Sequence, residues 1–549
     1  MKKLSVIAVV GLCFPVLMAE NIRLGDMRSS VNDVTLVCDG RVARGGWHVA
    51  PEVSPDVFET MAREVKFVSD CDSLMMTLEN EWDSRDFNII MAKGDTAAVR
   101  VVRVAANPFE NPSPEMRRVS PSGLLSREQA TFDIEAMFYA LSEVHPDIYS
   151  VCNQGDLLRA KNKAIASLGD SVSSVDLYRA AAPVVAMIGD GHTSLVFPYN
   201  SCFTKDLPRM PLYVDVMPDR TVKCASSLDS VIPRGARILS INGVASDVMI
   251  DSMLHYVSGE REHYRLHRVD NDFTALRHLL FPADSFVVEY RLSGASEVRN
   301  ITLPSVSYDE VKRRCPPTSR PEGRYEAYSY SVDEDNDVAV MDFRSFEGVD
   351  RMTAFADSMF SDLSRRGIGN LVIDLRNNGG GNSRVGDVLL RYITPIPYVQ
   401  MEKVLVRVTP LTVRLMGGGD MTPRVYYHEA KEDEYIRPLT AREGHYDGKV
   451  YLLTSTTTFS SAGSFAWAFK ECGIGTVIGE ETGGMNVAYG DILSYRLPLS
   501  GLRCSVSFKR FWQFRADEND IHGTIPDVAV RADEALDRTL GIIKAGKTK

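Results

Sequence analysis

A serine lies where an apolar strand is expected to give way to a helix. Ser461 follows the apolar residues Tyr451 to Leu453 and a hydroxyl-rich loop, and apolar residues at helical spacing come after it. The start of a helix offers unpaired backbone N–H groups and a partial positive charge, which suit the oxyanion of an acyl-transfer reaction. The small residues Ala462 and Gly463 leave room for a substrate carbonyl. Ser461 is therefore a candidate nucleophile, although serine is also a common helix N-cap.

A glycine turn upstream has three interpretations. An apolar strand from Leu371 to Leu375 leads into Arg376 and then into Gly379, Gly380 and Gly381. Glycines without a Cβ could direct backbone donors at a negative charge beside the serine. A phosphate loop is disfavoured, because no lysine follows the glycines. Taken alone, the residues favour a structural interpretation, in which Asp374 and Arg376 pair to fix the end of the strand.

A serine nucleophile also needs a base, because its hydroxyl is weakly nucleophilic until a neighbour accepts the proton. His192, in the stretch M-I-G-D-G-H-T-S-L, is the candidate, although a lone histidine at a helix end is more often structural. His145 is expected to be a helix-terminating contact. His263 and His267 have i,i+4 spacing but lack the glutamate of H-E-x-x-H, which predicts solvated side chains and no zinc site.

The beginning of the chain has the pattern of a secretory signal. Lys2 and Lys3 precede an apolar stretch from Leu4 to Met18, and Ala19 provides a small residue for cleavage, so residues 1–19 are predicted to be a signal peptide. The mature protein is then exported, to the periplasm or the cell exterior. Cys13 follows leucine where a lipoprotein signal has a small residue, so lipid anchoring is not expected. No later segment is long and apolar enough to span a membrane.

Composition excludes several partners. The 549 residues imply several domains, and 44% hydrophobic with 25% charged residues is ordinary for a soluble protein. A net charge of −11 disfavours nucleic acid and anionic membrane surfaces. The cysteines after the signal have no CxxC or metal-like spacing, so no metal site is expected. Only Cys38 and Cys71 are suggested as a pair, because both lie in the N-terminal region.

Hydrophobic periodicity divides the mature chain into regions, and the last alternates buried strands with helices. The predicted parts are an N-terminal β-rich accessory domain (20–115), a helical segment ending at G-D-G-H-T (126–200), a strand-rich domain (207–306) and an α/β core (325–540).

Five motifs in order carry a family resemblance. G-D-G-H-T, I-P-R-G-A-R-I-L-S-I-N-G-V, D-L-R-N-N-G-G-G, T-F-S-S-A-G-S and H-G-T-I-P-D-V resemble the C-terminal processing (tail-specific) and tricorn-core family of serine peptidases. The resemblance covers about residues 126–540. It implies a multidomain α+β protein with a crotonase-like ββα core, and it implies that residues 207–306, through Ile232 to Val244, are a PDZ-like domain that adds a peptide as an extra strand.

The resemblance also implies roles for individual residues. The catalytic serine of the family falls on Ser461, and the oxyanion donors fall on the Ala462 N–H and on Gly379 or Gly380 in the glycine turn. No metal or cofactor is implied.

One departure changes the expected mechanism. Where the tail-specific branch has its lysine base, this chain has Met485 and Asn486, and Lys509 on a later strand is a poor substitute. The tricorn branch uses a histidine before the PDZ-like domain, which matches His192, and a carboxylate before G-x-x-P-D. That carboxylate falls on Asp520, with Glu518 as the alternative.

The sequence thus predicts an exported serine endopeptidase that cleaves polypeptides through an acyl-enzyme. The alternative is a peptide-binding protein whose catalytic site has decayed. The missing lysine favours it, and so does Asp520, which stands where the family often has glutamate. The cleavage specificity and the oligomeric state are left open.

Overall fold

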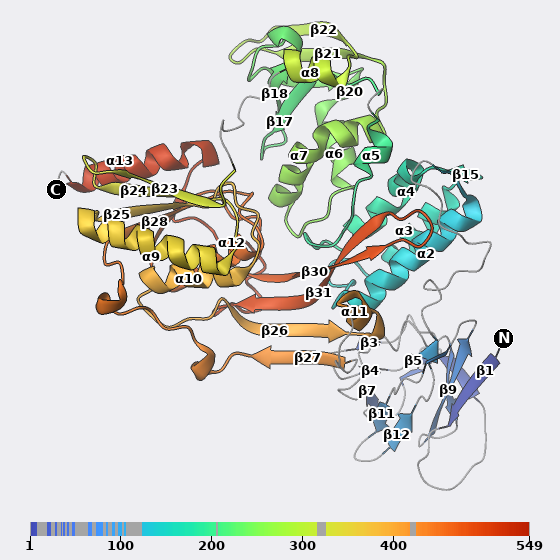
Figure 1. The fold of residues 1–549 in the computed structure, drawn as a ribbon. Coiled ribbons are helices and arrows are strands. Elements are labelled where there is room, and N and C mark those ends of the chain that lie inside the picture. The colour runs from blue at the N-terminus through green and yellow to red at the C-terminus, as the bar shows by residue number, and fades with distance from the viewer. Residues whose placement is uncertain are drawn as a thin grey trace. The chain divides into compact units, whose positions relative to one another are not determined.

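The computed structural model describes residues 123–204, 207–315, 325–417 and 424–547. Before residue 123 it describes only strands. The chain forms two compact units (Figure 1). Unit 1 comprises Met1–Thr204, Leu405–Tyr427 and Asp491–Lys509, and unit 2 comprises Lys205–Val404, His428–Gly490 and Arg510–Lys549. Both units contain helices and strands, so the prediction of a multidomain α+β protein is confirmed at this level.

The N-terminal region contributes strands to unit 1. One sheet has the order β1 (Lys2–Ile7), β9 (Ser73–Asn80), β8 (Glu64–Val68), β2 (Ala19–Ile22), and another the order β12 (Ala97–Arg100), β11 (Ile90–Lys93), β7 (Trp47–Val49). Three strand pairs are β3 (Arg28–Ser29) with β4 (Val34–Thr35), β5 (Val37–Cys38) with β6 (Arg41–Val42), and β10 (Ser84–Arg85) with β13 (Val104–Ala105). Strand β1 lies in the predicted signal segment, and cleavage there stays a prediction. The side chains of Cys38 and Cys71 lie outside the described residues.

Three helices of unit 1 begin at polar N-caps. They are α2 (Arg127–Val144), α3 (Gln154–Ala166) and α4 (Ser174–Ala186). Ser126 and Ser173 each form a capping box, which satisfies backbone donors at the start of α2 and α4. Shorter elements complete this part: β14 (Leu125–Ser126), β15 (Ser171–Val172), β16 (Ser194–Leu195), α5 (Tyr199–Cys202) and α11 (Pro410–Leu415).

Long strands contribute residues to both units. They are β26 (Met401–Val408), β30 (Val487–Arg496) and β31 (Arg503–Gln513), and their sheet has the order β16-β31-β26-β27, with β27 at Arg424–Glu429 and β30 paired to β31. Within unit 1, β16 pairs with the first part of β31 through Ser194 and Leu195. The buried carboxylate of Asp133 in α2 accepts hydrogen bonds from the Leu499 and Ser500 N–H groups, which fixes the turn before β31.

Unit 2 begins with an antiparallel sheet in the region expected to be PDZ-like. Its order is β17 (Leu212–Val216), β18 (Val222–Ser227), β19 (Arg237–Ile241), β21 (Ser285–Arg291), β22 (Val298–Pro304), and β20 (Val244–Ala245) pairs with β19. Three helices accompany this sheet: α6 (Ser246–Leu254), α7 (Glu262–Leu280) and α8 (Tyr308–Arg314).

The second sheet of unit 2 is the core. Its order is β23 (Tyr328–Asp333), β24 (Val338–Phe343), β25 (Asn370–Asp374), β28 (Lys449–Thr454), β29 (Gly475–Gly479), β32 (Val528–Ala529), parallel except for β23. Its helices are α9 (Val349–Arg366), α10 (Ser383–Ile393), α12 (Ser461–Glu471) and α13 (Ala535–Lys547). Short 3₁₀ turns occur at η2 (Leu228–Ser230), η3 (Glu432–Glu434), η4 (Ala441–Glu443) and η5 (Ala532–Glu534).

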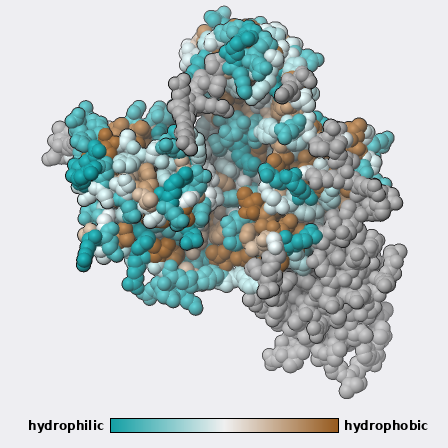
Figure 2. Space-filling model, in the orientation of Figure 1, coloured by the Kyte–Doolittle hydropathy of each residue, from teal (hydrophilic) through white to brown (hydrophobic). Residues whose placement is uncertain are grey.

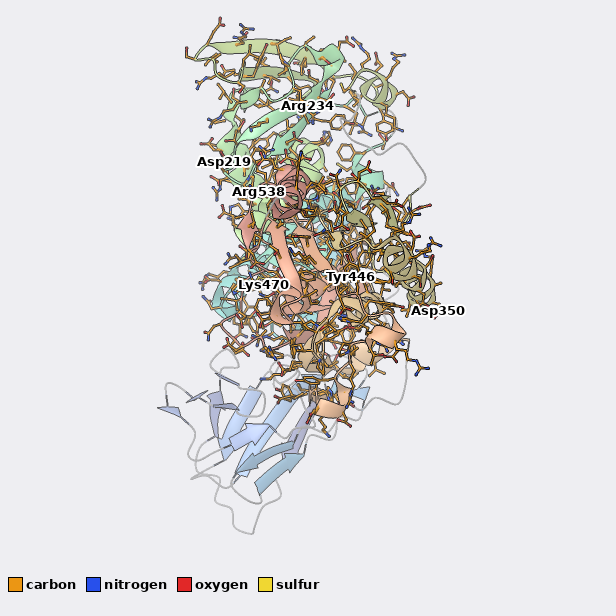
Figure 3. The ribbon with its side chains drawn as sticks, turned by 90° about the vertical axis from the view of Figure 1, so that its left-hand side faces the viewer. Asp219, Arg234, Asp350, Tyr446, Lys470 and Arg538 are labelled. Carbon is orange, nitrogen blue, oxygen red and sulfur yellow. The ribbon has the colours of Figure 1, made fainter. Side chains whose placement is uncertain are left out.

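Alternate residues of each core strand face opposite layers. Leu452 packs with α9, α10 and α12, whereas Tyr451 and Leu453 pack with α13 on the other face (Figure 1). This period of two is what a sheet covered by helices on both faces requires. The Tyr446 hydroxyl donates a hydrogen bond to the Ile368 carbonyl, on the face of the sheet that packs with α9, α10 and α12 (Figure 3). The buried apolar runs predicted from the sequence are therefore central strands.

Cysteine usage in the described part is simple. The cysteines whose side chains are described are all free thiols: Cys152, Cys202, Cys224, Cys315, Cys472 and Cys504. Burial raises the pKa of Cys472 to about 11 and that of Cys504 to about 12, so these two thiols are unreactive near neutral pH. Among the described residues, no helix has the length and apolar character needed to cross a bilayer.

Substitutions at two glycines test the packing of the core sheet. A Cβ on Gly475 in β29 would lie 1.9 Å from the Val450 carbonyl oxygen, so we expect Gly475→Ala to destabilise the protein by about 3 kcal/mol. A Cβ on Gly541, within α13, meets nothing within 4 Å. Gly541→Ala should instead stabilise by about 1 kcal/mol through helix propensity. Chemical denaturation of the two variants measures this, and equal stabilities would contradict the described strand spacing.

Candidate active site

Ser461 occupies the first position of α12, directly after the loop that follows β28. Its side chain is buried, and its Oγ donates a hydrogen bond of 2.6 Å to the Gly381 carbonyl oxygen. The N-cap position belongs to Ser460, whose side chain forms no capping hydrogen bond. The Ser461 hydroxyl therefore does not cap the helix, and the N-cap interpretation of this residue is wrong.

The backbone before Ser461 is strained. Ser460 has φ 53° and ψ −127°, a conformation that non-glycine residues rarely adopt and that costs about 1–3 kcal/mol. Such strain persists only where surrounding contacts enforce it, and it is concentrated at functional turns. The enforcing contacts here come from the glycine turn.

The glycine turn packs directly against the serine loop. A Cβ on Gly380 would lie 2.8 Å from the Phe459 carbonyl oxygen and 2.9 Å from the Ser461 nitrogen. A Cβ on Gly381 would lie 2.5 Å from the Phe346 carbonyl oxygen, and both glycines have positive φ. Any other residue at these positions would push the turn away from Ser461, so glycine is required by this close approach.

Asn378 organises the turn from the inside. Its buried side chain accepts a hydrogen bond of 2.8 Å from the Gly380 N–H and donates one of 2.7 Å to the Phe343 carbonyl. Its carbonyl accepts from the Phe459 N–H. The amide of Asn378 thereby joins the turn to the end of β24 and to the serine loop.

The structural interpretation of this segment is also correct. Arg376 donates to both carboxylate oxygens of Asp374 at 2.9 and 2.6 Å, and it reaches the Ala532 carbonyl. The hydrogen bonds from Asp374 raise the pKa of Arg376. The pair fixes the end of β25, and the glycines that follow lie beside Ser461. The role of the turn in binding an oxyanion stays a prediction.

The predicted oxyanion donors are hydrogen-bonded within the protein. The Ala462 N–H donates to the Phe459 carbonyl at 3.1 Å, and the Gly380 N–H donates to Asn378. A Cβ on Gly379 would meet nothing within 4 Å, so this glycine borders open space. Donation to an oxyanion by Gly379 or Gly380 stays a prediction.

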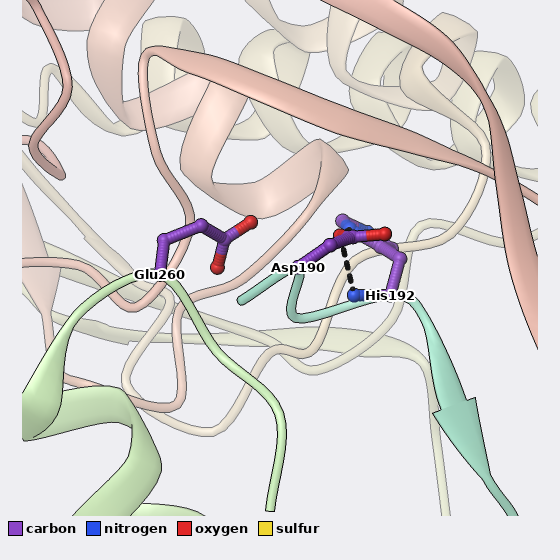
Figure 4. Close-up of side chains that lie close together, drawn as sticks. All are labelled: Asp190, His192 and Glu260. Carbon is purple, nitrogen blue, oxygen red and sulfur yellow. Dashed lines mark hydrogen bonds and ion pairs between the residues drawn. The ribbon is translucent and has the colours of Figure 1, made fainter. Parts of the chain in front are cut away.

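His192 lies in unit 1, between α4 and β16, and its side chain is 10% exposed. Its backbone N–H donates a hydrogen bond of 2.9 Å to Asp190 Oδ1, and its Nδ1 lies 3.8 Å from the same oxygen (Figure 4). Asp190 is fully buried. The sequence motif contained this aspartate, but only the fold shows that it is the carboxylate beside His192.

Asp190 has further partners in unit 1. Its Oδ2 accepts from Ser507 Oγ at 2.6 Å and lies 3.3 Å from His145 Nε2. Burial opposes ionisation of Asp190, but hydrogen bonds with His145 and His192 outweigh it and hold the pKa well below the usual value. His145 thus terminates α2, as predicted, and also belongs to this buried network.

The two carboxylates predicted to support His192 have partners in unit 2. Asp520 Oδ2 accepts from the Asp517 N–H at 2.8 Å, and its Oδ1 lies 3.5 Å from His522 Nε2. Glu518, the alternative, accepts from Trp512 Nε1 and pairs with Arg510. The support of His192 by either residue stays a prediction.

The residues at the place of the family lysine, and the later Lys509, have partners within the protein. Met485 and Asn486 are buried, and the Asn486 N–H donates to the His522 carbonyl. Lys509 Nζ lies 2.5 Å from Asp491 Oδ2 in an ion pair of unit 1. Lys509 therefore already has a carboxylate partner, which agrees with the view that it is a poor substitute base.

Helix α7 contacts the loops around Ser461 within unit 2. Tyr264 stacks on Phe459 with ring centroids 4.4 Å apart, and His263 Nε2 lies 3.2 Å from the Thr482 carbonyl oxygen. His267 Nε2 lies 3.4 Å from Thr457 Oγ1, and burial lowers its pKa. The prediction that His263 and His267 are solvated is therefore wrong, because the helix face that carries them packs on the core.

Comparisons with known proteins agree with this architecture. Residues 337–530 match the family model described as peptidase family S41. A solved structure described as mature CPAF complexed with lactacystin is similar over 77% of this chain and 98% of its own length, with 14% identity and a TM-score of 0.56. A crystal structure of mature CPAF covers 76% of this chain and 96% of its own, with 16% identity and a TM-score of 0.55.

The structural likeness shows the fold, and the family model covers the core strands from β24 to β32, the glycine turn and Ser461. Residues 337–530 belong to peptidase family S41, and the protein is a serine-type peptidase.

Proposed function

We propose that this protein is an exported serine endopeptidase that cleaves polypeptides through an acyl-enzyme formed on Ser461. The observation that carries the proposal is the Ser461 hydroxyl, which does not cap its helix and lies on a strained turn against Gly380 and Gly381. A serine serving only as a cap would bond to the amides of its own helix. The predicted signal peptide supports export.

Each step has a named group. Ser461 Oγ attacks the substrate carbonyl, and His192 accepts its proton and returns it to the leaving amine. The Ala462 N–H and the glycine turn, at Gly379 or Gly380, stabilise the oxyanion once substrate has displaced the internal hydrogen bonds. Every group that acts in this proposed mechanism is a side chain or backbone N–H of the protein.

Asp190 replaces Asp520 in our proposal as the carboxylate that positions His192. It is buried, has its pKa held low, and contacts His192 within the same unit. An ionised carboxylate at this place stabilises the imidazolium that forms during proton transfer.

The sheet of β17 to β22 supplies the proposed peptide-binding module. We assign residues 207–306 a PDZ-like role, in which a peptide is added as a strand. Because Tyr264 of α7 stacks on Phe459, a peptide bound to this module acts on the loop that carries Ser461. A decayed peptide-binding protein is the alternative function, favoured by the absence of the family lysine at Met485.

Labelling with a fluorophosphonate tests the nucleophile. We expect wild-type protein to be labelled and Ser461→Ala to lose all labelling, because the probe reacts only with an activated serine. Ser464→Ala is the matched control, since this buried serine lies in the same helix and should not carry the label. An unlabelled wild type that still binds peptides would instead establish the decayed alternative.

The labelling rate also tests the positioning carboxylate. We expect Asp190→Asn to slow labelling by about a hundredfold or more and to move the acid limb of the pH profile to lower pH, because a neutral amide no longer stabilises the imidazolium. Asp520→Asn should leave both unchanged. If Asp520→Asn alone slowed labelling, the carboxylate that positions His192 would be Asp520 and not Asp190. Thermal unfolding checks that both variants fold.

A further inference from the structure

A pocket of about 430 Å³ lies along α10 in unit 2, separate from the groups assigned to catalysis. Its apolar lining consists of Val349, Val388 and Ile436, and its charged lining of Arg384, Arg391, Arg437 and Asp387. Figure 2 shows polar and apolar surface side by side over this unit. Three guanidinium groups thus surround a partly apolar pocket.

The three arginines of this pocket are exposed and carry charges that are not taken up by an ion pair with a described residue. Within the described ranges, none of Arg384, Arg391 and Arg437 forms an ion pair or a side-chain hydrogen bond. Most other arginines of the core are paired, as Arg376 is with Asp374. An unpaired cluster of one sign attracts a ligand of the opposite sign.

The acidic groups nearby are already engaged. Asp387 Oδ1 accepts from Tyr398 Oη at 3.0 Å and from Gln400 Nε2 at 2.7 Å, and burial raises the pKa of this carboxyl. Glu443, whose pKa Arg391 helps to lower, accepts from the backbone N–H and the hydroxyl of Thr440. Asp387 lines the pocket together with three arginines and Glu443 does not line it, so the net charge of the lining is positive.

The pocket is connected to the glycine turn by short stretches of chain. Phe346, three residues before Val349, donates from its N–H to the Gly380 carbonyl at 3.0 Å and accepts from the Asn382 N–H. Arg384 stands at the second position of α10, which begins directly after this turn. Arg384 and Arg391 lie two helical turns apart on one face, about 10 Å, the length of roughly three extended residues.

We propose that this pocket binds an acidic, partly apolar segment of the polypeptide substrate and thereby selects substrates for Ser461. The proposal rests on the proposed peptidase function. Carboxylates pair with the arginine fork in bidentate hydrogen bonds, while apolar side chains cover Val349, Val388 and Ile436. A neutral or basic segment gains no such pairing with these exposed arginines, so it binds less tightly.

Fluorescence anisotropy with full-length Ser461→Ala protein tests this without cleavage. The probes are two fluorescein-labelled eight-residue peptides, one alternating Glu with Leu and one alternating Gln with Leu. We expect the Glu peptide to bind at least about tenfold more tightly, since each arginine contact contributes a few-fold. The combined variant Arg384→Gln, Arg391→Gln, Arg437→Gln should lose this preference.

Two control variants separate charge from folding. Arg538→Gln removes one exposed arginine of α13, which covers the other face of the core sheet, and should leave binding unchanged (Figure 3). Replacing the three pocket arginines by lysine retains the charge but not the bidentate fork, so it should restore only part of the preference for the Glu peptide. Equal binding of both peptides by the parent protein, or a preference that survives the triple glutamine variant, would overturn the proposal.

Failure of this proposal can be distinguished from failure of the peptidase function. Fluorophosphonate labelling of wild-type protein without any preference for the Glu peptide would refute the acidic pocket alone. A preference for the Glu peptide without labelling would support the pocket as a binding site and would refute its role in selecting substrates for cleavage.

Discussion

The close approach of the glycine turn to the loop before α12 is the constraint on which the candidate site depends. Strands β25 and β28 are parallel neighbours, so the segments that leave their carboxyl ends meet at one edge of the sheet. The Leu375 N–H continues the pairing by donating to Leu453, and only then do the chains separate. Because Gly380 and Gly381 have no Cβ, the backbone can reach Ser461, and the strain at Ser460 is held in place.

Asp190 is a buried carboxylate of unit 1 whose partners keep it charged. Asp190 remains ionised because His145, His192 and Ser507 all bond to it. Its folded-state pKa lies below the ordinary value of about 3.9, so its contribution to stability is present above that value and is lost as the pH falls through the folded-state pKa. The network thus keeps the histidine motif ordered throughout the neutral range.

Helix α7 and the arginine pocket connect the serine loop with two further parts of unit 2. Tyr264 stacks on Phe459, next to the strained residue, and a Cβ on Gly483 would lie 2.5 Å from the Tyr264 ring. Phe346 hydrogen-bonds to the glycine turn and leads into Val349 at the pocket. Both places are therefore joined by short contacts to the backbone around Ser461.

The sequence by itself determined the family, the multidomain α+β class and the two strand-to-turn segments, because apolar runs and ordered glycine motifs are local properties of the chain. It also excluded a lysine base at Met485. Tertiary structure decided which side chains meet. Asp190 is two residues from His192, yet its role depends on Ser507, which is distant in sequence. Packing of α7 places His263 and His267 against the loops of the core, and the fold brings Ile436 and Arg437 to the arginines of α10 in one pocket. Partners far apart in sequence leave no local signal, so only the fold can identify them.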